Sequence, residues 1–176
     1  MIDLAIALPA ALFAAYCALL AAAAAYDVCT FTIPNRVSLG LAGLFFVAAP
    51  LSPIQEPWLS HIGAGVAILA VGMVLFSFGC LGGGDVKLMS AVAFWTGFEH
   101  LPAFLFCVSI AGGVLALLLL LIRRLLQGRP GDRDAAAWLP LSRVLSAGES
   151  IPYALAIAPA GILVGIRLPG IGWPWP

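Results

Sequence analysis

Long apolar runs separated by short polar breaks constrain this chain more than any other feature of its sequence. Runs of membrane-spanning character lie at about 4–26, 37–54, 61–81, 101–122 and 151–168, with a shorter one at about 86–98. An α-helix needs about 20 apolar residues to cross the hydrocarbon core of a bilayer. The sequence therefore predicts an all-α membrane protein: one transmembrane domain over residues 1–176, a polytopic bundle of about six helices.

The composition excludes a soluble globular domain. Hydrophobic residues make up 63% of the 176 positions and charged residues only 9%, whereas soluble domains carry roughly 25% charged residues. The formal net charge is zero, so there is no basic footprint for nucleic acid. The four cysteines form no C-x-x-C pair, so the sequence has no zinc or redox motif of that kind. We expect the lipid bilayer as a partner and no nucleic acid.

The basic residues predict the orientation. With six spans, the loops after the first, third and fifth helices share one side of the membrane. Seven of the eight Lys and Arg residues fall in or next to these loops, and only Arg167 does not. The positive-inside rule places these loops, including the long loop 123–150, in the cytoplasm. Both chain termini are then expected outside, and the protein is expected to be multi-pass.

Two aspartates, Asp27 and Asp85, fall in the first two of these cytoplasmic loops. An ionisable side chain at a membrane edge is costly and therefore indicates a functional site. Two carboxyl groups a few ångströms apart can hydrolyse a peptide, since the ionised one activates water and the protonated one polarises the scissile carbonyl. Such a pair requires no metal or cofactor. Taken singly, each aspartate could instead cap a turn or a helix.

The glycines before Asp85 suggest how the two carboxyl groups could meet. Gly82, Gly83 and Gly84 have no Cβ, so the backbone there is expected to turn sharply and to approach another segment closely. Asp85 would then open the next helix, where the helix dipole favours a carboxylate. Runs of glycine are also common packing devices in membrane helices, and that alternative stays open.

Three further polar residues lie beside these segments. Lys87 would point to a different helix face from Asp85, either reaching to lipid headgroups or holding part of a substrate. Asn35, after Pro34, is expected to cap the second helix or to contact substrate. Tyr153 is expected either to hydrogen-bond near the aspartates or to anchor the last helix at the membrane interface.

These segments resemble a known family. Asp27 followed by Ile33-Pro34-Asn35, and Gly82-x-Gly84-Asp85-Val86-Lys87, resemble the two signature motifs of type IV prepilin peptidases, which are GxGD intramembrane aspartyl proteases. The segment 151–158 is similar to the last helix of that family, and the resemblance runs from about residue 10 to 165.

The resemblance implies a specific reaction. Such enzymes cleave the short basic leader from prepilin or pseudopilin precursors at the cytoplasmic face of the bacterial inner membrane. It implies Asp27 and Asp85 as the catalytic pair. From the residues themselves, we expect substrate or loop support from Gly82, Gly84, Lys87, Pro34, Asn35 and Tyr153.

Departures from the family pattern refine this expectation. The chain has no C-x-x-C insertion, and so it looks like the small form that serves tight-adherence (Flp) pili, a peptidase without N-methyltransferase activity. Ala154 stands where the family often has glycine, and Phe31 and Thr32 replace residues that are often basic. Preflagellin or presenilin-like GxGD proteases are related possibilities, but Ile33-Pro34-Asn35 favours the prepilin type.

A second hypothesis comes from a different class of protein. Carboxylates at a membrane edge and broken helices also describe a small membrane transporter or a proton-coupled channel. Against that hypothesis, the two halves of the chain show no convincing repeat, and both aspartates are expected at the cytoplasmic boundary rather than at the midplane.

Overall fold

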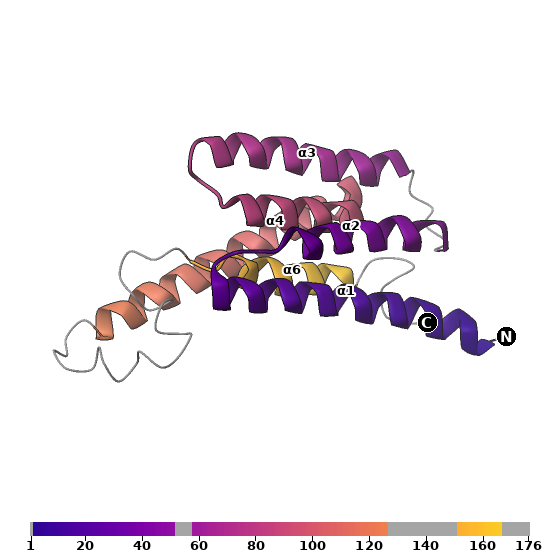
Figure 1. Ribbon diagram of the computed structural model, residues 1–176, viewed down its shortest axis with the longest axis horizontal. Helices are drawn as coiled ribbons and strands as arrows, with labels where there is room; N and C mark the ends of the chain where they lie inside the picture. Colours follow the sequence, from indigo (N-terminus) through magenta and orange to yellow (C-terminus); the bar gives the residue numbers. More distant parts are fainter. Residues whose placement is uncertain (1, 52–57, 127–150, 167–176) are drawn as a thin grey trace.

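The computed structural model describes residues 2–51, 58–126 and 151–166, and within them all regular structure is helical (Figure 1). The elements are α1 (Ile2–Thr30), α2 (Asn35–Ala48), the 3₁₀ turn η1 (Ala49–Leu51), α3 (Trp58–Ser77), α4 (Gly83–Leu126) and α6 (Ala154–Gly165). Of these, α1, α3 and α4 are long and apolar enough to cross a membrane, while α2 and α6 are shorter apolar helices. The prediction of an all-α membrane bundle is confirmed.

Helix α4 is two helical stretches joined at a kink. Gly97 has non-helical dihedral angles, φ 58° and ψ −179°, a conformation that is essentially restricted to glycine. Beyond it, α4 runs back toward the end of the bundle where it began (Figure 1). The two sides of the kink correspond to the separate helices expected at about 86–98 and 101–122.

Helix α1 continues beyond its expected end at residue 26 and finishes at Thr30. The Thr30 hydroxyl donates to the Tyr26 carbonyl at 2.8 Å, and the Phe31 N–H donates to the Asp27 carbonyl at 2.8 Å. Phe31 then leaves the helix with φ 51°, the left-handed conformation that commonly ends helices. Asp27 therefore lies in the last turn of a helix and not in the loop that follows it.

Helix α4 is the centre of the bundle, since α2, α3 and α6 all pack against it, while α1 packs on α2 and α6. Two buried aromatic residues tie these layers together through hydrogen bonds. The Tyr16 hydroxyl of α1 donates to the Gly161 carbonyl of α6 at 3.0 Å, and Trp95 Nε1 of α4 donates to the Leu41 carbonyl of α2 at 3.0 Å. In lipid, such polar groups find partners only inside the protein.

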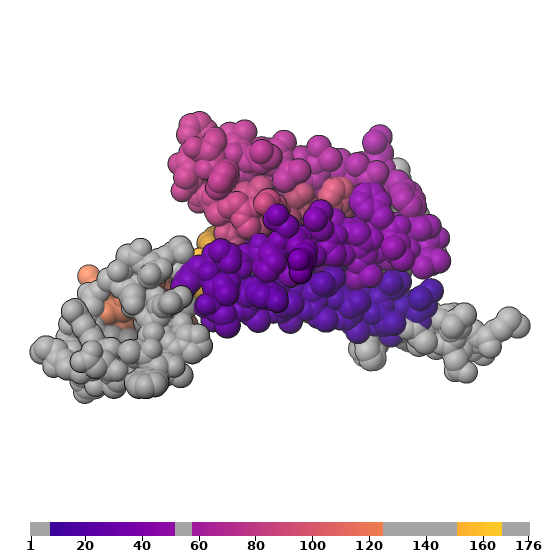
Figure 2. Space-filling model, in the orientation of Figure 1, coloured from indigo at the N-terminus to yellow at the C-terminus, as the bar shows by residue number. Residues whose placement is uncertain are grey.

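The outer face of α3 carries large apolar side chains that no described residue covers. They include Val66, Val71, Met73, Val74 and Phe76, all of which are exposed. In Figure 2, α3 forms the upper edge of the molecule, away from α1. Because lipid tails are the natural surroundings of such a surface, this face is consistent with a protein embedded in a bilayer.

We predict that Gly97→Ala destabilises the fold, because alanine is strained at φ 58° and its Cβ would lie 3.2 Å from the ring of His61. The free energy of unfolding in detergent should fall by about 1–3 kcal/mol. The matched control is Gly43→Ala in α2, where an added Cβ meets nothing within 4 Å. Wild-type stability of the Gly97 variant would contradict the observed kink.

Candidate active site

Asp27 is a buried carboxylate held by the start of another helix. Its side chain is 6% exposed, and its Oδ2 accepts the N–H of Ala154, the first residue of α6, at 2.9 Å. The first N–H groups of a helix have no partner within that helix, and the helix dipole adds positive potential there. The beginning of α6 therefore supplies what a carboxylate in an apolar setting needs.

Asp85 lies in the first turn of α4, half-buried. Its carboxylate accepts a hydrogen bond from the backbone of Gly82, an arrangement like that of an acidic residue that reaches back over the start of its own helix. The Asp85 carboxyl group also interacts electrostatically with Asp27. The structure therefore brings both aspartates into one site, where the end of α1 meets the beginnings of α4 and α6.

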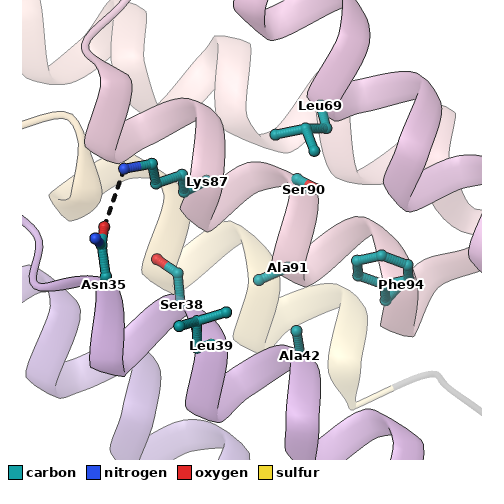
Figure 3. Close-up of a pocket in the computed structure, with 9 residues that line it drawn as sticks. All are labelled: Asn35, Ser38, Leu39, Ala42, Leu69, Lys87, Ser90, Ala91 and Phe94. Atoms are coloured by element: carbon teal, nitrogen blue, oxygen red, sulfur yellow. Dashed lines mark hydrogen bonds between the residues drawn. The ribbon is translucent and has the colours of Figure 1, made fainter.

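The segment that follows Asp27 in the sequence directly contacts the segment around Asp85. A Cβ on Gly84 would lie 3.2 Å from the Cβ of Ile33, so this close approach requires glycine. Lys87 Nζ donates to Asn35 Oδ1 at 2.9 Å across the same junction (Figure 3). These two contacts join the beginning of α4 to the beginning of α2.

The expectation that Asn35 caps the second helix is wrong. Pro34 occupies the N-cap position, and no side chain caps α2 there. Asn35 is already the first helical residue, and its amide oxygen instead accepts from Lys87. The bond to Lys87 runs between segments 52 residues apart in the sequence, so no local pattern indicated it.

The sharp turn expected at Gly82–Gly84 occurs earlier, at Gly79. Gly79 has φ 72°, its N–H donates to Phe76 O at 2.9 Å, and the Cys80 N–H donates to Leu75 O at 3.0 Å. This pair of bonds is the Schellman motif that ends a helix at a left-handed glycine. Gly82 and Gly84 allow close contacts instead. A Cβ on Gly82 would lie 2.8 Å from Asp85 Oδ2, and a Cβ on Gly84 would lie 3.2 Å from the Cβ of Ile33.

Tyr153 lies next to the site through its backbone. It is the N-cap residue of α6, directly before Ala154, and its carbonyl accepts from Ala156 at 2.9 Å. Its hydroxyl packs on α4, where a Cβ on Gly112 would lie 2.5 Å from it. Within the described residues, the hydroxyl has no recorded bond to either aspartate. Ala154, whose N–H reaches Asp27, was noted in the sequence only as a departure from glycine.

The fold and the site together define an integral membrane protein whose helix ends gather two carboxyl groups. The model of the type IV leader peptidase family matches residues 14–117, a stretch that contains both aspartates. The chain belongs to that family, as the motifs predicted. In the part of the chain that the structure covers, no group of three or more His, Cys, Asp or Glu side chains could hold a metal ion.

Two matching relatives are named prepilin leader peptidase/N-methyltransferase. The Bacillus subtilis (strain 168) protein is 26% identical over 139 residues, which cover 78% of this chain and 53% of that protein. The Dickeya chrysanthemi protein is 30% identical over 118 residues, covering 62% of this chain and 41% of that protein. The chain thus spans about half the length of the curated relatives it matches. No solved structure matches it. These relatives do not favour the transporter or channel hypothesis.

We predict that the Lys87–Asn35 hydrogen bond couples the stabilities of α4 and α2. In a double-mutant cycle with Lys87→Met and Asn35→Ala, the two losses of unfolding free energy should be non-additive by about 0.5–2 kcal/mol. The control cycle pairs Asn35→Ala with Ser109→Ala, because the Ser109 hydroxyl bonds the Leu105 carbonyl within its own helix. Additivity in the first cycle would show that the bond does not form.

Proposed function

We propose that this protein is a prepilin leader peptidase that cleaves the short basic leader of a prepilin or pseudopilin precursor with Asp27 and Asp85. The observation that carries the proposal is that Asp27, in the last turn of α1, and Asp85, in the first turn of α4, lie within electrostatic reach of each other in a chain of the type IV leader peptidase family. The names of the two relatives support the same reaction, and the tight-adherence (Flp) type is the form we propose.

The proposed reaction uses the pair as a unit that shares one proton, because two adjacent carboxyl groups do not readily ionise together. The ionised carboxylate takes a proton from water, and the water oxygen attacks the scissile carbonyl carbon. The protonated partner donates to the carbonyl oxygen. When the tetrahedral intermediate collapses, the C–N bond breaks, and the leaving amine takes the proton that the base removed from water. The hydroxyl formed from the carbonyl oxygen returns its proton to the carboxylate that donated it, so the pair again shares one proton.

We place this site at the cytoplasmic face of the bacterial inner membrane, with both termini on the other side. Arg36 and Lys87 lie near the aspartates in the sequence, and Arg123 and Arg124 lie in the last turn of α4, at the same end of the bundle (Figure 1). Basic residues are enriched on the cytoplasmic side of membrane proteins. The beginning of α1 lies at the opposite end of the bundle.

We predict that Asp27→Asn and Asp85→Asn each lower kcat for cleavage of a pilin precursor by at least about 100-fold, the usual contribution of an acid or base group. Asparagine keeps the shape of the side chain, and its amide oxygen can still accept the bond from Ala154 or Gly82. The assay follows release of the leader by purified protein in detergent or liposomes.

The matched control for both variants is Glu99→Gln, which removes an exposed carboxylate beside the Gly97 kink. It should cleave at the wild-type rate. If either aspartate variant retains wild-type kcat while its thermal unfolding is unchanged, the two-carboxyl mechanism is wrong.

We further propose cleavage without N-methylation, because the 176-residue sequence contains no C-x-x-C pair of the kind described for the larger members of the family. The cleaved product should keep an unmodified N-terminal amine after incubation with S-adenosylmethionine. Mass spectrometry of the product measures this directly, and a gain of one methyl group would contradict the proposal.

A further inference from the structure

A pocket of about 380 Å³ lies between α2, α3 and α4, within the size range of small-molecule sites, about 300–1,000 Å³. Both α2 and α3 pack on α4, and they contact each other where the ring of Phe45 stacks on His61, with centroids 5.5 Å apart. Helix α4 therefore forms the floor of the pocket between them. Leu39 on one wall is 69% exposed and Leu69 on the other is 37% exposed. The pocket therefore opens sideways, toward the lipid-facing surface.

The two ends of this pocket differ in chemistry (Figure 3). Lys87 and Asn35 stand at the end nearest the beginnings of α2 and α4. At the other end Phe94 packs on Phe45 and Phe46, with ring centroids 6.0 Å and 5.7 Å apart. An amphiphile with its polar head at Lys87 and its chain directed toward Phe94 matches this polarity.

Ser38 carries an unsatisfied polar group inside the pocket. Its side chain is 6% exposed, and its hydroxyl has no hydrogen-bond partner, although Ser38 lines the pocket. Figure 3 shows the oxygen directed to the space between α2 and α4. A buried hydroxyl without a partner costs free energy, so a ligand that supplies an acceptor beneath its head group would satisfy it.

The charge at the mouth of the pocket selects an anion. The recorded hydrogen bond of the Lys87 ammonium within the described residues goes to the neutral amide of Asn35. An ammonium group has three N–H donors, so two of them are left for an anionic head group. A glycerophospholipid carries a phosphate, ester carbonyls below it and apolar chains below those. The phosphate would meet Lys87, an ester carbonyl would accept from Ser38, and a chain would lie against Phe94.

The pocket does not share the face of α4 that carries Asp85. Lys87, Ser90, Ala91 and Phe94 recur at helical spacing on one side of α4. At about 100° per residue, Lys87 lies about 200° around the helix from Asp85. A substrate segment bound at the aspartates would therefore lie across the helix from this pocket, and the surrounding lipid is the better occupant.

We propose that the α2/α3/α4 pocket is a binding site for one anionic phospholipid, with the phosphate at Lys87 and a chain against Phe94. This binding does not depend on the peptidase reaction. Native mass spectrometry of the purified protein, incubated with phosphatidylglycerol and phosphatidylcholine of identical chains, measures it. Wild-type protein should retain one lipid, with phosphatidylglycerol preferred about fivefold, the effect of about one lysine near an anionic head group.

Four variants test the parts of the pocket. Ala42→Phe fills the pocket and should lose the bound lipid, while the control Val47→Phe adds the same ring at an exposed position of α2 outside the pocket and should keep it. Ser38→Ala should lower lipid retention without adding volume. Lys87→Gln should keep a lipid but lose the preference for phosphatidylglycerol.

Two competitors distinguish other ligands. Glycerol phosphate should not displace phosphatidylglycerol, because it has no acyl chain; equal competition would show a site for a free anion and overturn the proposal. A pilin-precursor peptide should not displace the lipid either, and displacement would assign the pocket to substrate. The proposal also fails if Ala42→Phe, folded as judged by circular dichroism, retains phosphatidylglycerol as the wild type does.

Discussion

The hydrogen bond from the Ala154 N–H to the Asp27 carboxylate is the interaction on which the arrangement of this bundle depends. A buried carboxylate in apolar surroundings is tolerated only where protein donors hold it. This requirement places the start of α6 against the last turn of α1. The hydrogen bond from Tyr16 to Gly161 then fixes α6 along α1. The two helices lie close together there, since a Cβ added to Gly161 would lie only 3.1 Å from the side chain of Leu20.

A second pair of contacts holds α4 in the same site. Gly84 against Ile33 and Lys87 bonded to Asn35 join the start of α4 to the start of α2, and α2 follows α1 after a short break. The end of α1 and the beginnings of α4 and α6 thus converge on Asp27 and Asp85. Helix termini carry unpaired backbone groups, so they can supply donors to carboxylates without inserting further polar side chains into lipid.

Local patterns predicted the helices better than their ends. Apolar runs indicated each helix, because composition alone decides which segments can lie in a bilayer. The end of α1 was expected four residues too early, since Asp27 looked like a loop residue until its partner on α6 was known. Likewise, the turn expected at Gly82–Gly84 lies at Gly79, where a glycine directly after an apolar helix is the usual ending signal.

The sequence by itself determined the class of the protein, its helical content, its family and the two aspartates that merit attention. Those follow from hydropathy and from short motifs, which are local properties. Only the tertiary structure decided that Ala154 holds Asp27, that Lys87 bonds Asn35, and that a pocket opens beside Ser38. Both hydrogen bonds and the pocket involve helices that are distant in the sequence. Such features depend on how whole helices pack together, and no local sequence pattern encodes that packing.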